Sequence, residues 1–130
     1  DVIRMAMSSA GPKRIALVTD AMSATGQPDG DYILGSLPVK VVDGRARLLA
    51  ADGSLGAIAG STLTMGRAVE FVTSVVGIPL GQVAVMAATT PAKLHGLNEV
   101  GVIEEGHWAD LCLTDAKGHL VRVIHRGEAV

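Results

Sequence analysis

The stretch RIALVTD, residues 14–20, constrains the fold of this chain more than any other. It is short, rich in apolar residues and not alternating, which is typical of a strand buried on both faces of a parallel sheet. The residues before it, 2–6, place apolar side chains at helical spacing, and Gly11-Pro12 ends that helix. A helix followed by a buried strand predicts an α/β protein.

The composition excludes several classes of protein. The chain has 130 residues, of which 48% are hydrophobic and 18% charged, so it is globular rather than disordered. One Trp, one Tyr, one Phe and a net charge of −2, with no basic run, argue against a nucleic-acid partner. No apolar run has the roughly 18 residues of a membrane span, so no membrane partner is expected. Cys112 is the single cysteine, which excludes a disulfide framework and favours a reducing, cytoplasmic compartment.

The first residues, DVIRMAMSSAGPKR, suggest that the chain is part of a longer protein. They contain no continuous apolar core of a signal peptide and no initiator Met. Their pattern is that of the middle of a helix. We therefore expect further sequence before Asp1.

Two β-rich regions are predicted. Asp43-Gly44 stands between two apolar runs and predicts a hairpin with strands at about 38–43 and 45–50. After Gly101, short apolar runs separated by glycines predict antiparallel strands at 109–115, 120–126 and 128–130. A boundary is expected near 97–101, where the chain passes into this second region.

Helices are expected between these two regions. Residues 61–77 open on a Ser/Thr cap and close at Gly77. A second helix begins near Pro79 and runs to about Ala88. A third covers 90–96, with Thr90 as its cap and Pro91 at its first position.

Asp20 is the foremost candidate for chemistry. Functional groups of α/β folds lie at the carboxyl ends of strands, and Asp20 ends the run at 14–20. A carboxylate there could act as a general base, bind a metal or cap the following turn. The residue types alone leave these roles open, because Asp is common in turns.

Other polar and reactive residues have expected structural roles. No pair among the histidines has the spacing of metal ligands, so surface or packing positions are expected for His95, His107, His119 and His125. Cys112 lies in an apolar run and is expected to be a buried thiol. The segment GSLGAIAGST lacks the lysine of a phosphate-binding loop and is expected to be a simple loop.

Longer motifs resemble a known family. In chain order they are LVTDAMSATG, DGDYILG, AGSTLTM, TTPAKLHGL and GVIEEGHWADLCLTD. This series resembles the C-terminal part of the N-acetylglucosamine-6-phosphate deacetylases, which belong to the amidohydrolase superfamily. The last two motifs are shared across that superfamily, whereas TDAMSATG with AGSTLTM points to the deacetylases. The segment 54–60 departs from the family by a few extra residues.

The resemblance implies a fold. Members of the family have a metal-dependent (β/α)8 barrel and a small β-sandwich domain. Residues 1–97 would then be the C-terminal part of the barrel, with a hairpin insertion at about 31–52, and residues 98–130 a share of the sandwich. Such a barrel needs about 250 residues, so the chain would be the C-terminal portion of a longer enzyme.

The resemblance also implies an activity. It is the hydrolysis of the N-acetyl group of N-acetylglucosamine 6-phosphate to glucosamine 6-phosphate and acetate. Asp20 matches the family's catalytic aspartate, the general base and acid acting on a metal-activated water. Ile58, Ala59 and Gly60 match positions that contact the substrate. A divalent metal ion, zinc or similar, and a homodimer of the full-length enzyme are implied, but the family's metal ligands lie upstream and match no residue here.

Two alternatives remain at this stage. The shared C-terminal motifs also fit another amidohydrolase, for example a dihydroorotase-like or deaminase-like enzyme. The hairpin and the final strands could instead form a non-catalytic β interaction module. If the chain is part of a deacetylase, residues 1–130 alone are expected not to deacetylate the sugar phosphate, because no residue here matches the family's metal ligands.

Overall fold

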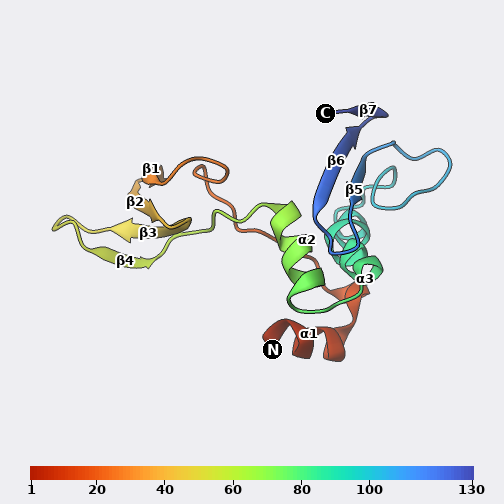
Figure 1. Ribbon diagram of the computed structural model, residues 1–130, viewed down its shortest axis with the longest axis horizontal. Helices are drawn as coiled ribbons and strands as arrows, with labels where there is room; N and C mark the ends of the chain where they lie inside the picture. The colour runs from red at the N-terminus through yellow and green to blue at the C-terminus, as the bar shows by residue number, and fades with distance from the viewer. The chain divides into compact units, whose positions relative to one another are not determined.

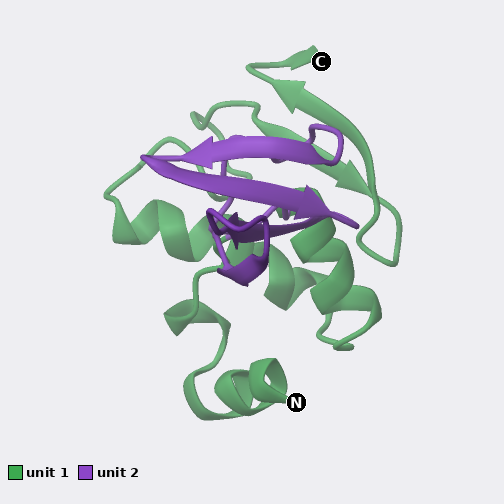
Figure 2. Ribbon diagram, turned by 90° about the vertical axis from the view of Figure 1, so that its left-hand side faces the viewer, with its two compact units in different colours: residues 1–18, 65–130 green, residues 19–64 purple.

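The computed structural model describes residues 1–130 and divides them into two compact units. Unit 1 contains Asp1–Val18 and Met65–Val130, and unit 2 contains Thr19–Thr64 (Figure 2). No helix in either unit has the length and apolar character to cross a membrane. The boundary expected near 97–101 concerns the domains of a longer chain and stays a prediction.

Unit 2 is built on a four-stranded antiparallel sheet (Figure 1). Its strands follow chain order: β1 Gly30–Leu34, β2 Leu37–Val42, β3 Arg45–Leu49 and β4 Leu55–Ile58. The predicted β2–β3 hairpin is confirmed. Asp43 and Gly44 both have positive φ, 51° and 68°, as the favoured two-residue hairpin turn requires.

The other two strands of unit 2 were not predicted. The segment 54–60, expected to be a simple loop, instead contributes β4, which pairs with β3 through Arg47↔Ile58 and Leu49↔Leu55. Gly56 and Ala57 in this strand are small residues with low strand propensity, which hid it from pattern analysis. Its cross-strand partners, rather than its own residues, determine its conformation.

One face of the sheet carries the core of unit 2. Val39, Val41 and Ala46 are buried there, with Tyr32 and Leu48 packed beside them. Side chains from outside the sheet complete the cluster, namely Met22, Ala24 and Ala59. The segments around residues 20–24 and 59–61 are therefore held against the sheet by apolar packing.

Unit 1 contains the helices. They are α1 Val2–Ala10, the 3-10 turn η1 Pro12–Arg14, α2 Met65–Ser74, α3 Leu80–Ala84, the π-helical turn η2 Val85–Thr89 and α4 Thr90–Leu94 (Figure 1). The predicted end of α1 is confirmed, since Gly11 has φ 72°. Val72, Ile78 and Val83 form the buried cluster of this unit, against which Ile3 and Leu17 pack.

The prediction of Thr90 as a helix cap is wrong. Thr90 has helical φ and ψ of −64° and −50°, and the chain stays helical from Leu80 to Leu94. Pro91 is tolerated inside this helical stretch because η2 has π geometry, with the N–H of Thr90 bonded to the carbonyl of Val85. Proline supplies no N–H for the next carbonyl, that of Met86, and the N–H of Leu17 bonds it instead at 3.0 Å.

The prediction of a strand at 14–20 is wrong for this chain. Residues 15–20 belong to no strand, although Ile15 has extended φ and ψ. Val18 is 79% exposed, whereas a strand buried on both faces would bury its side chain. A parallel strand exists only through hydrogen bonds to neighbouring strands, and no barrel forms within these 130 residues to provide them.

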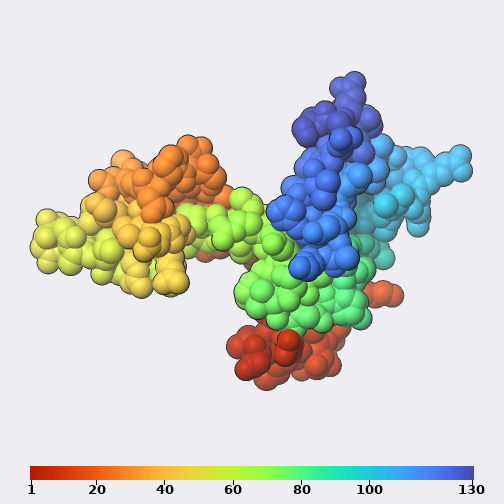
Figure 3. All heavy atoms as spheres, in the orientation of Figure 1, coloured from red at the N-terminus to blue at the C-terminus, as the bar shows by residue number.

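The C-terminal strands form an antiparallel sheet, as predicted. It contains β5 Leu111–Thr114, β6 Leu120–His125 and β7 Glu128–Ala129. Cys112 is exposed, so the prediction of a buried thiol is wrong. The loop that precedes β5, light blue in Figure 3, projects from the surface, with Ile103 87% exposed.

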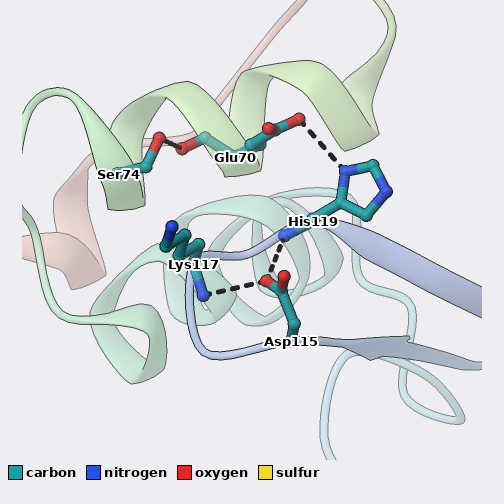
Figure 4. Close-up of polar contacts among 5 residues, drawn as sticks. All are labelled: Glu70, Ser74, Asp115, Lys117 and His119. Carbon is teal, nitrogen blue, oxygen red and sulfur yellow. Dashed lines mark hydrogen bonds and ion pairs between the residues drawn. The ribbon is translucent and has the colours of Figure 1, made fainter.

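A carboxylate closes the β5–β6 hairpin (Figure 4). Asp115 accepts hydrogen bonds from the backbone N–H groups of Lys117 and His119, both at 2.9 Å. The bond from His119, and less strongly the bond from Lys117, holds the pKa of Asp115 below its ordinary value. A lowered folded pKa means that the carboxylate contributes stability above about pH 4, and the contribution is lost as the pH falls below that value. His119 also lies 3.6 Å from Glu70 of α2.

Candidate functional site

Two backbone hydrogen bonds hold the chain at and just after Asp20. The N–H of Ser61 donates to the carbonyl of Asp20 at 2.8 Å, and the N–H of Met22 donates to the carbonyl of Ser61 at 2.9 Å. These bonds make a parallel bridge between Ala21 and Ser61. The Asp20 side chain is exposed, and φ of the residue is 53°. An exposed carboxylate on a fixed backbone can accept a proton from a bound molecule.

The structure brings Asp20 together with the residues expected to contact the substrate. Ile58, Ala59 and Gly60 lead directly into Ser61, the residue bonded to Asp20. A Cβ atom at Gly60 would lie 3.3 Å from the Asp20 carbonyl oxygen. Asp20 and Gly60 are therefore neighbours in unit 2, and Ile58 and Ala59 precede Gly60 in the chain. Their roles stay predictions.

The three residues differ in what they present to solvent. Ile58 ends β4 and is 72% exposed, whereas Ala59 is 5% exposed and its N–H donates to the carbonyl of Ala46 at 3.0 Å. The side chain of Ala59 is therefore not available to a ligand, and its N–H is already hydrogen-bonded. Gly60 has φ 63°, a conformation that glycine adopts without steric cost.

Sequence reasoning missed Ser61 as a positioning residue. Its carbonyl also accepts a hydrogen bond from Thr25 Oγ1 at 3.2 Å, and its hydroxyl oxygen accepts one from the N–H of Leu63 at 2.8 Å. Ser61 thus ties the segment after Asp20 to the segment before α2. Ser61 lies in the motif AGSTLTM, which marked this segment as noteworthy, but nothing in the motif indicated that Ser61 bonds to Asp20.

These residues do not fit a complete metal site. No group of three or more His, Cys, Asp or Glu residues that could hold a metal ion occurs in the chain. His125 lies 3.0 Å from Asp110, and His119 pairs with Glu70. Both contacts are two-residue surface pairs, in keeping with the expected surface positions of these histidines.

The sequence profile of the amidohydrolase family matches residues 3–130. The chain belongs to the amidohydrolase family. It is 35% identical over 118 residues to an N-acetylglucosamine-6-phosphate deacetylase of Vibrio furnissii, covering 90% of this chain and 28% of that protein. It is also 32% identical to a putative N-acetylgalactosamine-6-phosphate deacetylase of Escherichia coli K12, covering 89% of this chain and 67% of that protein.

Solved structures give the same result. An N-acetylglucosamine-6-phosphate deacetylase from Thermotoga maritima matches 98% of this chain with a TM-score of 0.83 and 37% identity. A mutant of the Mycobacterium smegmatis enzyme, in complex with N-acetyl-D-glucosamine-6-phosphate, matches with a TM-score of 0.84 and 35% identity. The chain spans about a third of these two structures, 34% and 33%. Its two small sheets and its helices therefore correspond to part of a deacetylase structure.

Gly60→Ala is expected to destabilise the protein by about 1–3 kcal/mol, because alanine would be strained at positive φ and its Cβ would press on the Asp20 carbonyl. Denaturant unfolding of the complete natural protein measures this change. Gly30→Ala is the matched control in the same unit, since its Cβ would meet only a Tyr32 ring atom at 3.9 Å. Equal losses for the two variants would contradict the constraint at Gly60.

Proposed function

We propose that the complete protein hydrolyses the N-acetyl group of N-acetylglucosamine 6-phosphate, yielding glucosamine 6-phosphate and acetate. The observation that carries the proposal is that the Ala21–Ser61 bridge holds Asp20 beside Gly60, the last of the three residues 58–60. The similarity to N-acetylglucosamine-6-phosphate deacetylases over most of the chain supports the same activity.

Asp20 acts as general base and then as general acid in this proposal. Its carboxylate accepts the proton of the attacking water and returns it to the leaving amine. The fixed backbone at Asp20 limits the positions that the carboxylate can take, which favours proton transfer. A bound divalent ion would lower the pKa of that water. Residues 1–130 contain no group of three metal-binding side chains, so other parts of the complete protein would have to supply ligands.

Residues 58–60 form part of the pocket wall. Gly60 brings its backbone close to Asp20 without a side chain, and backbone polar groups can bind a sugar. Ile58 contributes an exposed apolar side chain. We also propose that the complete protein forms a barrel, in which residues 14–20 gain neighbouring strands. The complete protein is further proposed to be a homodimer in the cytoplasm.

A second substrate deserves comparison. The Escherichia coli K12 relative is named for the galacto epimer, and this chain covers 67% of that protein. The two sugars differ only at one hydroxyl group, so the same carboxylate chemistry serves both. We assign the gluco epimer, which both solved relatives above carry in their names.

Acetate release by the complete natural protein tests the proposal. With both sugar phosphates as substrates, we expect kcat/KM to be about tenfold or more higher for N-acetylglucosamine 6-phosphate, the scale on which one substrate contact discriminates. Equal rates, or faster turnover of the galacto epimer, would overturn the assignment of the substrate. Acetate release from neither sugar, by a protein loaded with a divalent metal, would overturn the activity itself.

A further inference from the structure

Ser61 is bound by a single short loop, residues 20–25. Its N–H donates to the carbonyl of Asp20 at 2.8 Å. Its carbonyl accepts two hydrogen bonds, one from the N–H of Met22 at 2.9 Å and one from the hydroxyl of Thr25 at 3.2 Å. The loop therefore holds Ser61 from both of its ends, and Thr25 contributes its bond through a side chain.

Thr25 lies on a part of the loop that is itself fixed. Its N–H donates to the carbonyl of Met22 at 2.9 Å, which closes a turn over residues 22–25. Met22 and Ala24 are 7% and 1% exposed and belong to the core cluster of unit 2. Because threonine is branched at Cβ, its side chain has few χ1 states, which limits where the hydroxyl can point. Thr25 therefore connects a packed turn to Ser61, and all of these contacts lie within unit 2.

The backbone of Asp20 needs support of this kind. Its φ of 53° is uncommon for a residue with a side chain, and such a conformation persists only where the surrounding structure imposes it. The hydrogen bond from Ser61 to the Asp20 carbonyl is one such constraint. Without the Thr25 hydroxyl, Ser61 would be held less firmly. Asp20 could then relax to other φ and ψ values, which would turn its carboxylate.

We propose that Thr25 is a positioning residue for the carboxylate of Asp20. The inference rests on the proposed function, in which that carboxylate accepts and returns the proton of the attacking water. Thr25 contacts neither the water nor the sugar in this account, and it acts on Asp20 through Ser61. Proton transfer needs the carboxylate in a narrow range of positions, so loss of the Thr25 hydroxyl reduces the fraction of molecules that are ready to react.

Steady-state assay of acetate release by the complete natural protein and its Thr25→Val variant tests the proposal. Valine has nearly the shape of threonine but no donor. We expect kcat to fall about fivefold, the scale of one neutral hydrogen bond, with a smaller change in KM. Thr25→Ser keeps the hydroxyl and should retain most of kcat. Tyr32→Phe is the matched control, because it removes another hydroxyl-to-carbonyl bond of unit 2, from Tyr32 to Pro28, and should leave kcat unchanged.

A double variant separates positioning from a general loss of structure. If Thr25 acts through the Asp20 carboxylate, Thr25→Val should lower kcat no further in an Asp20→Asn background. Effects that multiply in the double variant would overturn the proposal, since independent sites are additive in free energy. Hydrogen exchange at the amide of Ser61 gives a readout that does not depend on activity. We expect faster exchange in Thr25→Val than in the natural protein or in Tyr32→Phe.

Failure of this inference can be distinguished from failure of the proposed function. An active natural protein whose Thr25→Val variant keeps normal kcat, or normal exchange at Ser61, would overturn the role of Thr25 alone. A metal-loaded natural protein that releases no acetate would overturn the proposed function, and the role of Thr25 in that reaction with it.

Discussion

Asp20→Asn in the complete protein is expected to lower kcat for deacetylation by about 10²-fold or more, the usual scale for loss of a general base. Asparagine has nearly the shape of aspartate but cannot accept the proton of the attacking water. Because substrate contacts are retained, KM should change little. Steady-state assay of acetate release across substrate concentrations measures both quantities.

Asparagine is the right replacement because of the backbone at this position. Asp20 has φ 53°, a region that Asn and Asp enter more readily than other residues with a side chain. The hydrogen bond from Ser61 reaches the Asp20 carbonyl, which the substitution leaves in place. Asp20→Ala would combine the loss of the carboxylate with backbone strain, and its lower activity would have two causes.

Asp43→Asn is a matched control in the same unit. Asp43 also has positive φ, 51°, but lies in the β2–β3 turn, outside the candidate site. We expect this variant to keep the kcat and KM of the natural protein. If Asp20→Asn also retained normal kcat, Asp20 would be a turn residue and the proposed mechanism would be wrong.

The elements predicted correctly are those with local causes. Helix α1 ends where Gly11 takes positive φ, and the β2–β3 hairpin follows from Asp43-Gly44. The C-terminal sheet follows from short apolar runs separated by glycine turns. In each case the residues that determine the structure are neighbours in sequence, so a short stretch carries the full signal.

The elements predicted wrongly depend on distant partners. Residues 14–20 have a strand composition, but hydrogen bonds from neighbouring strands decide whether they form one. Strand β4 forms in a segment without strand character because β3 lies beside it. Pro91 stays inside a helical stretch because the distant N–H of Leu17 bonds the carbonyl of Met86.

The candidate site shows the same division. The position of Asp20 at the end of an apolar run gave a candidate carboxylate and left three roles open. Its proximity to Gly60 depends on the Ala21–Ser61 bridge, whose partners are far apart in sequence. Only the resemblance of two motifs to one family connected them beforehand, and pattern analysis of either segment alone contained no such link.

Residues 1–130 expressed alone are expected to release no measurable acetate from N-acetylglucosamine 6-phosphate. The chain presents Asp20 but no group of three metal-binding side chains, so nothing lowers the pKa of the water that Asp20 would deprotonate. A carboxylate is too weak a base to deprotonate a water that no metal ion activates. The missing activation removes far more of the rate than the loss of Asp20 itself.

The assay compares the isolated chain with the complete natural protein, at equal molar concentration and with zinc added to both. Circular dichroism on the isolated chain reports whether the helices of unit 1 form, which separates loss of fold from loss of chemistry. Metal analysis after gel filtration should find less than one zinc ion for each isolated chain. Acetate release that rises in proportion to the isolated chain, and disappears in its Asp20→Asn variant, would contradict this prediction, because residues 1–130 would then contain the whole catalytic machinery.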